Sequence, residues 1–192
     1  MAGRAGDART ARTIVNVKTV VLGPRPAELE ALIARRHAVG IDLFDEMWEG
    51  SYHVAPAPSA GHAFLDNVLA VILHPYAQAA GLTGTGPFNL GLPDDYRVPD
   101  RGYHRGQPTG TWVPIAAMVV EIISPDDETY EKFGFYAKHG VEEILVADPT
   151  ARSVTIWRRT PEASYDESPA SVLLGISVAD LAPQITWPMD SD

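Results

Sequence analysis

Three residues of this 192-residue chain have types and positions suited to metal-assisted hydrolysis: Asp100, Glu121 and Lys132. Glu121 interrupts the apolar run 116–123 (AAMVVEII), where an unpaired carboxylate would be costly to bury. Asp100 ends an extended segment, and Lys132 follows the apolar run. Neighbouring strands and the next helix can bring these groups to one point. Carboxylates bind Mg²⁺, the metal acidifies a water, and a lysine orients that water or stabilises phosphate, so the group indicates phosphodiester hydrolysis.

Each of these residues, taken alone, also has an ordinary structural explanation. Asp100 after Pro99 could form an Asx turn. Lys132 could be a solvated helix residue that pairs with Glu128, and Glu121 could be a neutralised or salt-bridged core acid. Other polar candidates could belong to a helix start, a hairpin or a turn: His62, Glu46, Glu49 and Asp148.

Other kinds of chemistry lack their residues. The chain has no cysteine, which excludes disulfides, Cys-ligated zinc, iron–sulfur clusters and thiol nucleophiles. It has no G-x-S-x-G, HExxH or Walker lysine, and the Gly-rich run 81–86 leads into Pro87. The histidines show no metal-ligand spacing.

The first half of the chain predicts a strand, a helix, a hairpin and a long helix. We place them at 14–22, at 26–37, at 43–49 with 52–55 around Gly50-Ser51, and at 61–80. Pro75 predicts a kink or an early end of the long helix.

The second half predicts a strand-rich region and two more helices. Short extended segments run from 84 to 123, with a loop over 104–114 and a central strand at 116–123. A helix follows at 127–139 before Gly140, and then strands at 141–147, 153–157 and 172–174 and a helical turn at 178–181.

Length and charge bound the domain organisation and the location. We expect a basic N-terminal tail over 1–12 and a single domain over 13–192. The net charge is −10, with +4 in residues 1–40 and −14 in the rest. The chain has no apolar run of about 18 residues and no secretory h-region, so we expect a cytoplasmic protein with no membrane association.

An ordered set of motifs resembles the Uma-two family of restriction-endonuclease-like proteins, in the PD-(D/E)XK nuclease superfamily. The resemblance covers roughly residues 26–160. Its motifs are 46–50 (EMWEG), Ser59 with His62, Pro99-Asp100, 119–125 (VVEIISP), 131–136 (EKFGFY), 140–143 (GVEE) and 147–149 (ADP).

The resemblance implies a fold, a cofactor and roles for particular residues. The fold would be α/β, with a restriction-endonuclease-like mixed central β-sheet flanked by helices. Asp100 and Glu121 would bind Mg²⁺, with Mn²⁺ as a possible substitute, and the backbone carbonyl of Ile122 would be a third ligand. Lys132 would be the catalytic lysine, and Glu46 a further acid beside it.

The resemblance also implies DNA as a partner and a homodimer. Tyr136 would share the helix face of Lys132, and His62 could contact phosphate or a water; their roles stay open. The chain departs from the family pattern at Ile123, where the superfamily's lysine usually lies, at Gly50-Ser51, at Ile144-Leu145 and over 101–114.

We therefore expect a Mg²⁺-dependent endonuclease that hydrolyses DNA phosphodiester bonds. One alternative is a catalytically silent nuclease-like fold that acts as a binding or assembly module. Another is a metal-dependent hydrolase with a different substrate. The net charge of −10 argues against extensive non-specific binding to DNA. Carboxylates are, however, also what a cation site requires.

Overall fold

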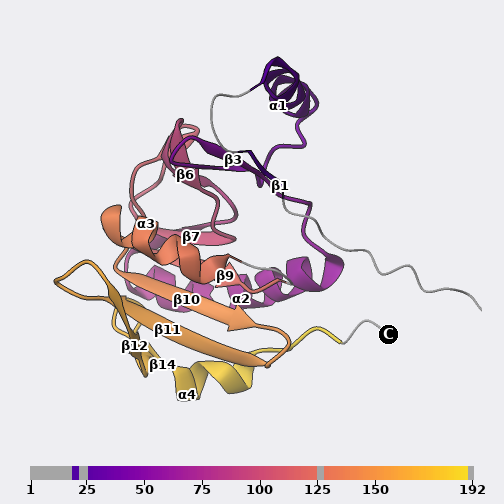
Figure 1. Ribbon diagram of the computed structural model, residues 1–192. Coiled ribbons are helices and arrows are strands. Elements are labelled where there is room, and N and C mark those ends of the chain that lie inside the picture. Colours follow the sequence, from indigo (N-terminus) through magenta and orange to yellow (C-terminus); the bar gives the residue numbers. More distant parts are fainter. Residues whose placement is uncertain (1–18, 22–25, 125–127, 190–192) are drawn as a thin grey trace, which may run out of the picture.

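The computed structural model describes residues 19–21, 26–124 and 128–189 (Figure 1). Its helical segments are α1 (Ala27–Val39), α2 (Ala60–Ala79), η1 (Thr129–Lys132), α3 (Phe133–Lys138), α4 (Val178–Leu181) and η2 (Ala182–Gln184). Its strands are β1 (Thr19–Val21), β2 (Glu46–Trp48), β3 (Ser51–Val54), β4 (Leu82–Thr85), β5 (Asn89–Leu92), β6 (Asp95–Arg97), β7 (Arg101–Arg105), β8 (Trp112–Val113), β9 (Met118–Ile122), β10 (Glu143–Asp148), β11 (Ser153–Arg159), β12 (Tyr165–Ser168), β13 (Ala170–Ser171) and β14 (Ile176–Ser177).

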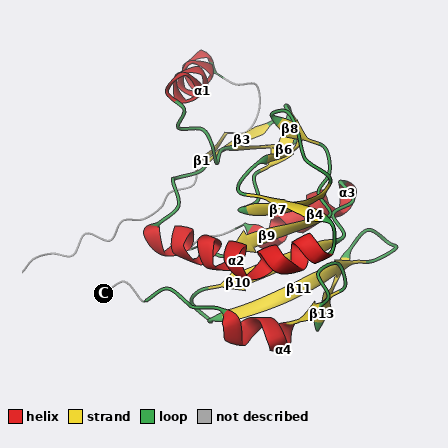
Figure 2. Ribbon diagram, turned by 180° about the vertical axis from the view of Figure 1, so that it is seen from behind, coloured by secondary structure: helices red, strands yellow, loops and turns green. Residues whose placement is uncertain are grey.

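A mixed sheet forms the centre of the molecule. Its strand order is β12-β11-β10-β9-β7-β4, in which β9 and β10 are parallel and the other neighbours antiparallel. Helix α3 covers one face, and α2 covers the other, as the two opposite views show (Figures 1 and 2). The predicted mixed sheet flanked by helices is confirmed.

The two central strands are buried on both faces because helices cover both sides. Alternate residues of β9 and β10 therefore enter different cores. Val120 and Leu145 pack with α2, whereas Val119 and Ile144 pack with α3. Glu121 follows the alternation and points to the α3 face, where it meets polar groups from that helix.

A second sheet of the described chain lies beside the first, in the order β1-β3-β2-β6-β5-β8. Its hairpin β2–β3 turns at Glu49 and Gly50, both with positive φ (48° and 89°), as a two-residue hairpin turn requires. Ser51, predicted as part of the turn, instead begins β3. Helix α1 is joined to this sheet by a bidentate contact of Arg36 with the buried Asp45, at 2.7 and 2.8 Å.

The predicted strand at 172–174 is wrong. These residues form a turn between β13 and β14 because other groups take their backbone amides. The buried Glu143 carboxylate accepts hydrogen bonds from Val172 N (2.8 Å) and Leu173 N (3.2 Å), and Ser171 Oγ accepts one from Leu174 N (2.9 Å). A long-range carboxylate therefore overrides the local β propensity.

Three further predictions are compared with the structure at the level of element boundaries. Helix α2 continues through Pro75 to Ala79, so it does not end early. The loop expected over 104–114 is shorter, because β7 extends to Arg105 and β8 begins at Trp112. Of the strand expected at 14–22, only β1 lies within the described residues.

The helix predicted at 127–139 is instead the 3-10 helix η1 followed by the short α3, and the strand predicted at 43–49 is shortened to β2. Helix α4 lies at the predicted 178–181. Among the described residues, no helix is long and apolar enough to cross a membrane.

Candidate active site

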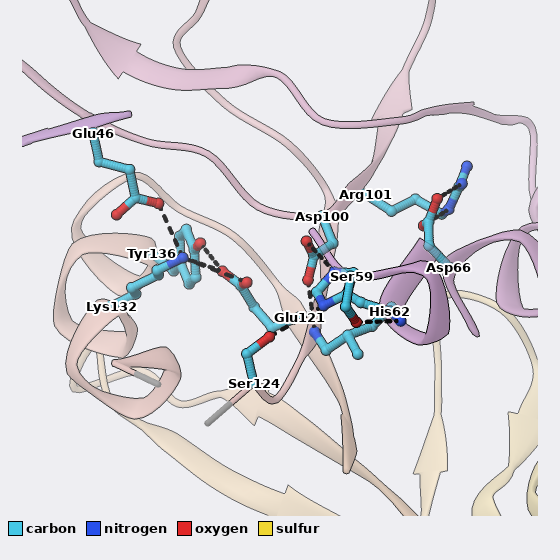
Figure 3. Close-up of polar contacts among 11 residues, drawn as sticks. Glu46, Ser59, His62, Asp66, Asp100, Arg101, Glu121, Ser124, Lys132 and Tyr136 are labelled. Atoms are coloured by element: carbon cyan, nitrogen blue, oxygen red, sulfur yellow. Dashed lines mark hydrogen bonds and ion pairs between the residues drawn. The ribbon is translucent and has the colours of Figure 1, made fainter. Parts of the chain in front are cut away.

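The candidate site lies where the two large sheets meet. Glu46 comes from β2 of the second sheet, and Glu121 comes from β9 of the central sheet. Asp100 lies in the link between β6 and β7, which joins the two sheets. Lys132 ends η1, and Tyr136 follows one helical turn later on α3. Figure 3 shows Lys132 between Glu46 and Glu121, with Tyr136 beside Glu121. Asp100 lies nearby and is turned toward His62.

Lys132 is the centre of the group. Its Nζ lies 2.9 Å from Glu46 Oε1 and 3.3 Å from Glu121 Oε1. The residue is only 8% exposed, so the alternative of a solvated lysine paired with Glu128 is wrong. A buried ammonium between two carboxylates is held in one place, which suits a group that must act at a fixed point.

Glu46 is fixed as firmly as the lysine that it contacts. Its Oε1 accepts a hydrogen bond from Val98 N at 2.8 Å, and its Oε2 accepts one from Trp48 Nε1 at 2.6 Å. With 5% exposure it is no ordinary hairpin charge, in contrast to the exposed Glu49.

Burial makes Glu121 a weaker acid than an exposed glutamate, because it raises the pKa of the carboxyl group. Its side chain accepts a hydrogen bond from the Tyr136 hydroxyl and contacts Lys132. Desolvation raises the pKa of Glu121 to about 8; Lys132 opposes this rise, and the nearby Asp100 carboxylate adds to it. Desolvation alone would lower the pKa of Lys132, but Glu121 and Glu46 outweigh it and raise that pKa. Glu46, Glu121 and Asp100 thus place three carboxyl groups around the single ammonium of Lys132.

Asp100 has a different set of partners. Its Oδ2 accepts a hydrogen bond from Ile122 N at 2.8 Å, and its Oδ1 lies 2.9 Å from His62 Nε2. His62 Nδ1 in turn lies 3.2 Å from Ser124 Oγ. Asp100 thus binds across to β9 rather than forming the Asx turn that its position after Pro99 allows.

The fold places His62 at this point through a helix cap. Ser59 Oγ accepts a hydrogen bond from His62 N at 3.2 Å, so α2 begins beside the site. The same helix orients Asp66, which pairs with Arg101 at 2.8 Å (Figure 3). Asp148, in contrast, forms the turn predicted for it, accepting from the Thr150 and Ala151 amides.

Comparison with known proteins identifies the family. The family model Uma2, described as "Putative restriction endonuclease", matches residues 42–190. The chain belongs to the Uma2 family. A crystal structure of "a putative nuclease belonging to DUF820" from Anabaena variabilis ATCC 29413 has a TM-score of 0.59 and 17% identity, covering 73% of this chain and 90% of that one. This similarity shows the fold, and no curated protein matches the chain.

In this Uma2 chain the donor types fit a hard divalent cation, although the described residues include no cluster of three or more His, Asp or Glu side chains arranged around one point. Mg²⁺ keeps several waters and is often bound by only one or two carboxylates, so Asp100 and Glu121 provide ligands of the right type and number. The excess of carboxylates over ammonium groups also favours a cation. Ile122, the predicted third ligand, offers its backbone; its side chain is buried in the core.

Sequence reasoning missed three residues of this region of the Uma2 chain: Trp48, Arg97 and Ser124. Trp48 and Ser124 hold the predicted Glu46 and His62 through hydrogen bonds. Both lie within the quoted motifs, so only their partners were missing. Arg97 ends the short strand β6, two residues before Pro99-Asp100. Its side chain is buried, which no local pattern indicates.

Proposed function

We propose that this chain is a Mg²⁺-dependent endonuclease that hydrolyses DNA phosphodiester bonds. The observation that carries the proposal is the buried contact of Lys132 with Glu46 and Glu121, beside Asp100, which bonds the backbone at the end of β9. Membership of the Uma2 family supports nuclease chemistry. The Lys132 ion pair alone would not need Asp100 beside it, whereas Mg²⁺ can use Asp100 and Glu121 as its two carboxylate ligands and keep several waters.

Each side chain has a role that its contacts support. Asp100 and Glu121 would hold the cation, with the carbonyl of Ile122 and water completing its ligands. When bound, Mg²⁺ would supply positive charge against the phosphate and acidify a water. Lys132 Nζ would orient the attacking water or stabilise the phosphate, and Glu46 would keep Lys132 in position. Mn²⁺ is an expected substitute for Mg²⁺.

The proposed reaction forms one bond and breaks one. The water oxygen bonds to phosphorus as one bridging phosphorus–oxygen bond breaks. The leaving oxygen gains a proton and becomes a hydroxyl, and the water loses one. Lys132 keeps its proton in this scheme, because two carboxylates hold it in the charged form and raise its pKa.

DNA is the proposed substrate, a second copy of the chain the proposed assembly partner, and the cytoplasm the proposed location. Analytical ultracentrifugation would test the homodimer separately from the chemistry.

A cleavage assay with matched variants tests the function. Purified protein is mixed with single- and double-stranded DNA with Mg²⁺, with Mn²⁺ or with chelator. We expect metal-dependent cleavage that Asp100→Ala and Glu121→Ala abolish, together with Mg²⁺ binding in calorimetry. Glu167→Ala, at an exposed acid on β12, should leave both intact. If both site variants cut like the wild type in a contaminant-free preparation, the proposed mechanism is wrong.

A silent nuclease-like module is the second candidate. It is favoured by one observation: Asp100 and Glu121 each already accept hydrogen bonds from their own protein partners. This alternative predicts a stable fold with no measurable Mg²⁺ binding. Calorimetry on the wild type therefore separates the two candidates before any substrate is known.

A further inference from the structure

Arg97 occupies a closed position between two aromatic rings. The centre of its guanidinium lies 4.2 Å from the Trp48 ring centroid and 4.1 Å from the Phe135 ring centroid. Only 5% of the residue is exposed, and its Nε has no hydrogen-bond partner among the described residues. Stacking on aromatic faces suits the flat, weakly hydrated guanidinium. An arginine buried in this way cannot serve as an exposed contact to DNA phosphate.

The same guanidinium contacts several of the elements that form the site. Arg97 lies on β6, and its Nη1 donates to Met47 O of β2 at 2.8 Å, to Tyr96 O at 3.1 Å and to Asp95 Oδ1 at 3.1 Å. Phe135 belongs to α3. Arg97 therefore joins β2 and β6 of the second sheet to the helix that packs on the central sheet.

A chain of contacts leads from Arg97 to Lys132. The Trp48 ring that stacks on Arg97 donates its Nε1–H to Glu46 Oε2 at 2.6 Å. Glu46 Oε1 then lies 2.9 Å from Lys132 Nζ. On the other side, Phe135 precedes Tyr136, whose hydroxyl donates to Glu121. The continuous route of contacts from Arg97 to Lys132 therefore runs through Trp48 and Glu46.

We infer that Arg97 is a positioning residue that fixes Lys132 through Trp48 and Glu46. The inference deepens the proposed function and rests on it for its kinetic consequence. Its structural part, the coupling of Arg97 to the Trp48 indole, can be measured without any cleavage.

Kinetics with Arg97→Gln and Arg97→Lys test the inference. We expect Arg97→Gln to lower kcat by about 10²-fold with KM for DNA unchanged, because a displaced catalytic group slows the reaction without weakening binding. Arg97→Lys should recover part of this loss. The control is Arg159→Gln, since Arg159 also bonds α3, at Ala137 O (2.9 Å), but lies outside this chain of contacts. Its kcat should equal that of the wild type.

A double-mutant cycle separates positioning from a general loss of structure. If Arg97 acts through Glu46, the double variant Arg97→Gln with Glu46→Gln should cut no more slowly than Glu46→Gln alone. Losses that multiply instead overturn the inference, as does a wild-type kcat in Arg97→Gln. Should Arg97→Gln fail to fold, Trp48→Phe replaces it, because it keeps a ring over Arg97 but removes the indole donor. The same loss of kcat is expected.

Hydrogen exchange of the Trp48 indole gives a readout that needs no activity. We expect slow exchange in the wild type and clearly faster exchange in Arg97→Gln, with Arg159→Gln unchanged. Equal exchange rates in the wild type and Arg97→Gln overturn the inference. If the wild type cuts no DNA but the indole result holds, the proposed function fails and the coupling of Arg97 to Trp48 stands.

Discussion

Lys132 is a single ammonium surrounded by carboxylates. Glu46 and Glu121 contact it directly, and Asp100 adds negative potential nearby. Burial makes each of these charges expensive on its own, so the stability of the group depends on all its members. This dependence leads to a stability prediction that does not require nuclease activity.

Lys132→Met should destabilise the fold by about 3 to 5 kcal/mol, because it leaves buried carboxylates without their cation. Folding raises the pKa of Glu121 from 4.5 to about 8, so its contribution to stability is present below pH 4.5 and is lost as pH rises through 8. Without Lys132 this pKa rises further, and the deficit should therefore be larger at pH 9 than at pH 5. Urea denaturation at both pH values measures it.

Lys138→Met is the matched control for that experiment. Lys138 ends α3, the helix that follows Lys132, but its side chain is 69% exposed and its Nζ lies 3.7 Å from Asp95 Oδ2. An exposed pair of this kind contributes about 0 to 1 kcal/mol. A similar loss in both variants, or a deficit in Lys132→Met that is the same at both pH values, would contradict the assignment of Lys132 to a buried charge cluster.

Tyr103 gives a second pH prediction away from the site. Burial raises its pKa to about 12, although Arg101 opposes the rise. Its contribution to stability is therefore complete below pH 10 and is lost as pH rises from 10 to 12. Between pH 10 and pH 12 the free energy of unfolding of the wild type should fall by about 2 kcal/mol more than that of Tyr103→Phe, as measured by urea denaturation. Parallel pH curves for the two proteins would show that Tyr103 ionises normally.

At the scale of elements, the site depends on how closely α3 approaches the β5–β6 hairpin. Gly91 on β5 has φ +121°, and a Cβ at this position would lie 2.4 Å from Asp95 O and 2.9 Å from Phe135 Cζ. Only glycine allows both the backbone conformation and the approach of Phe135, which stacks on Arg97.

Gly91→Ala should therefore destabilise the protein by about 2 to 4 kcal/mol, because strain and overpacking add. The control is Gly106→Ala: Gly106 also has positive φ (+96°), but a Cβ there has nothing within 4 Å. That variant should show the backbone cost alone, about 1 kcal/mol. Thermal melts of both variants measure the difference, and equal melting temperatures would exclude tight packing of α3 at Gly91.

The scale of elements also shows where sequence patterns suffice. Helix α2, the buried strand β9 and the β2–β3 hairpin, whose turn lies one residue before the predicted Gly50-Ser51, follow from turn residues and hydrophobic period, which are local properties. The failed strand at 172–174 has the opposite cause. Its amides bond to Glu143, a residue distant in the sequence, and no local pattern contains that information.

At the scale of the whole molecule, the charge distribution limits DNA binding. Basic residues near the site motifs already have acidic partners: Arg97 bonds Asp95, Arg101 bonds Asp66, and Arg105 bonds Glu142. With a net charge of −10, few cations are left to contact phosphates. The protein should therefore bind DNA weakly, and its affinity should depend only shallowly on salt.

The predicted basic N-terminal tail over 1–12, which lies outside the described residues, provides the test at this scale. If residues 1–12 are a solvated tail, their deletion should leave both cleavage and the salt dependence of DNA binding unchanged. If Arg4, Arg9 and Arg12 instead contact phosphates, the slope of log affinity against log salt should fall by about three. Fluorescence anisotropy with labelled DNA at several salt concentrations distinguishes the two results.

Local sequence patterns were enough to predict most of the elements, the family resemblance and the chemical types at the site. Asp100, Glu121 and Lys132 stand out because a carboxylate in an apolar strand and a PD dipeptide are visible locally. Only the tertiary structure decided how they meet: Glu46 crosses from the second sheet to Lys132, His62 binds Asp100, and Arg97 lies buried between two rings. These contacts join residues distant in the chain, and their geometry depends on how the two sheets and α3 pack together, which no short pattern encodes.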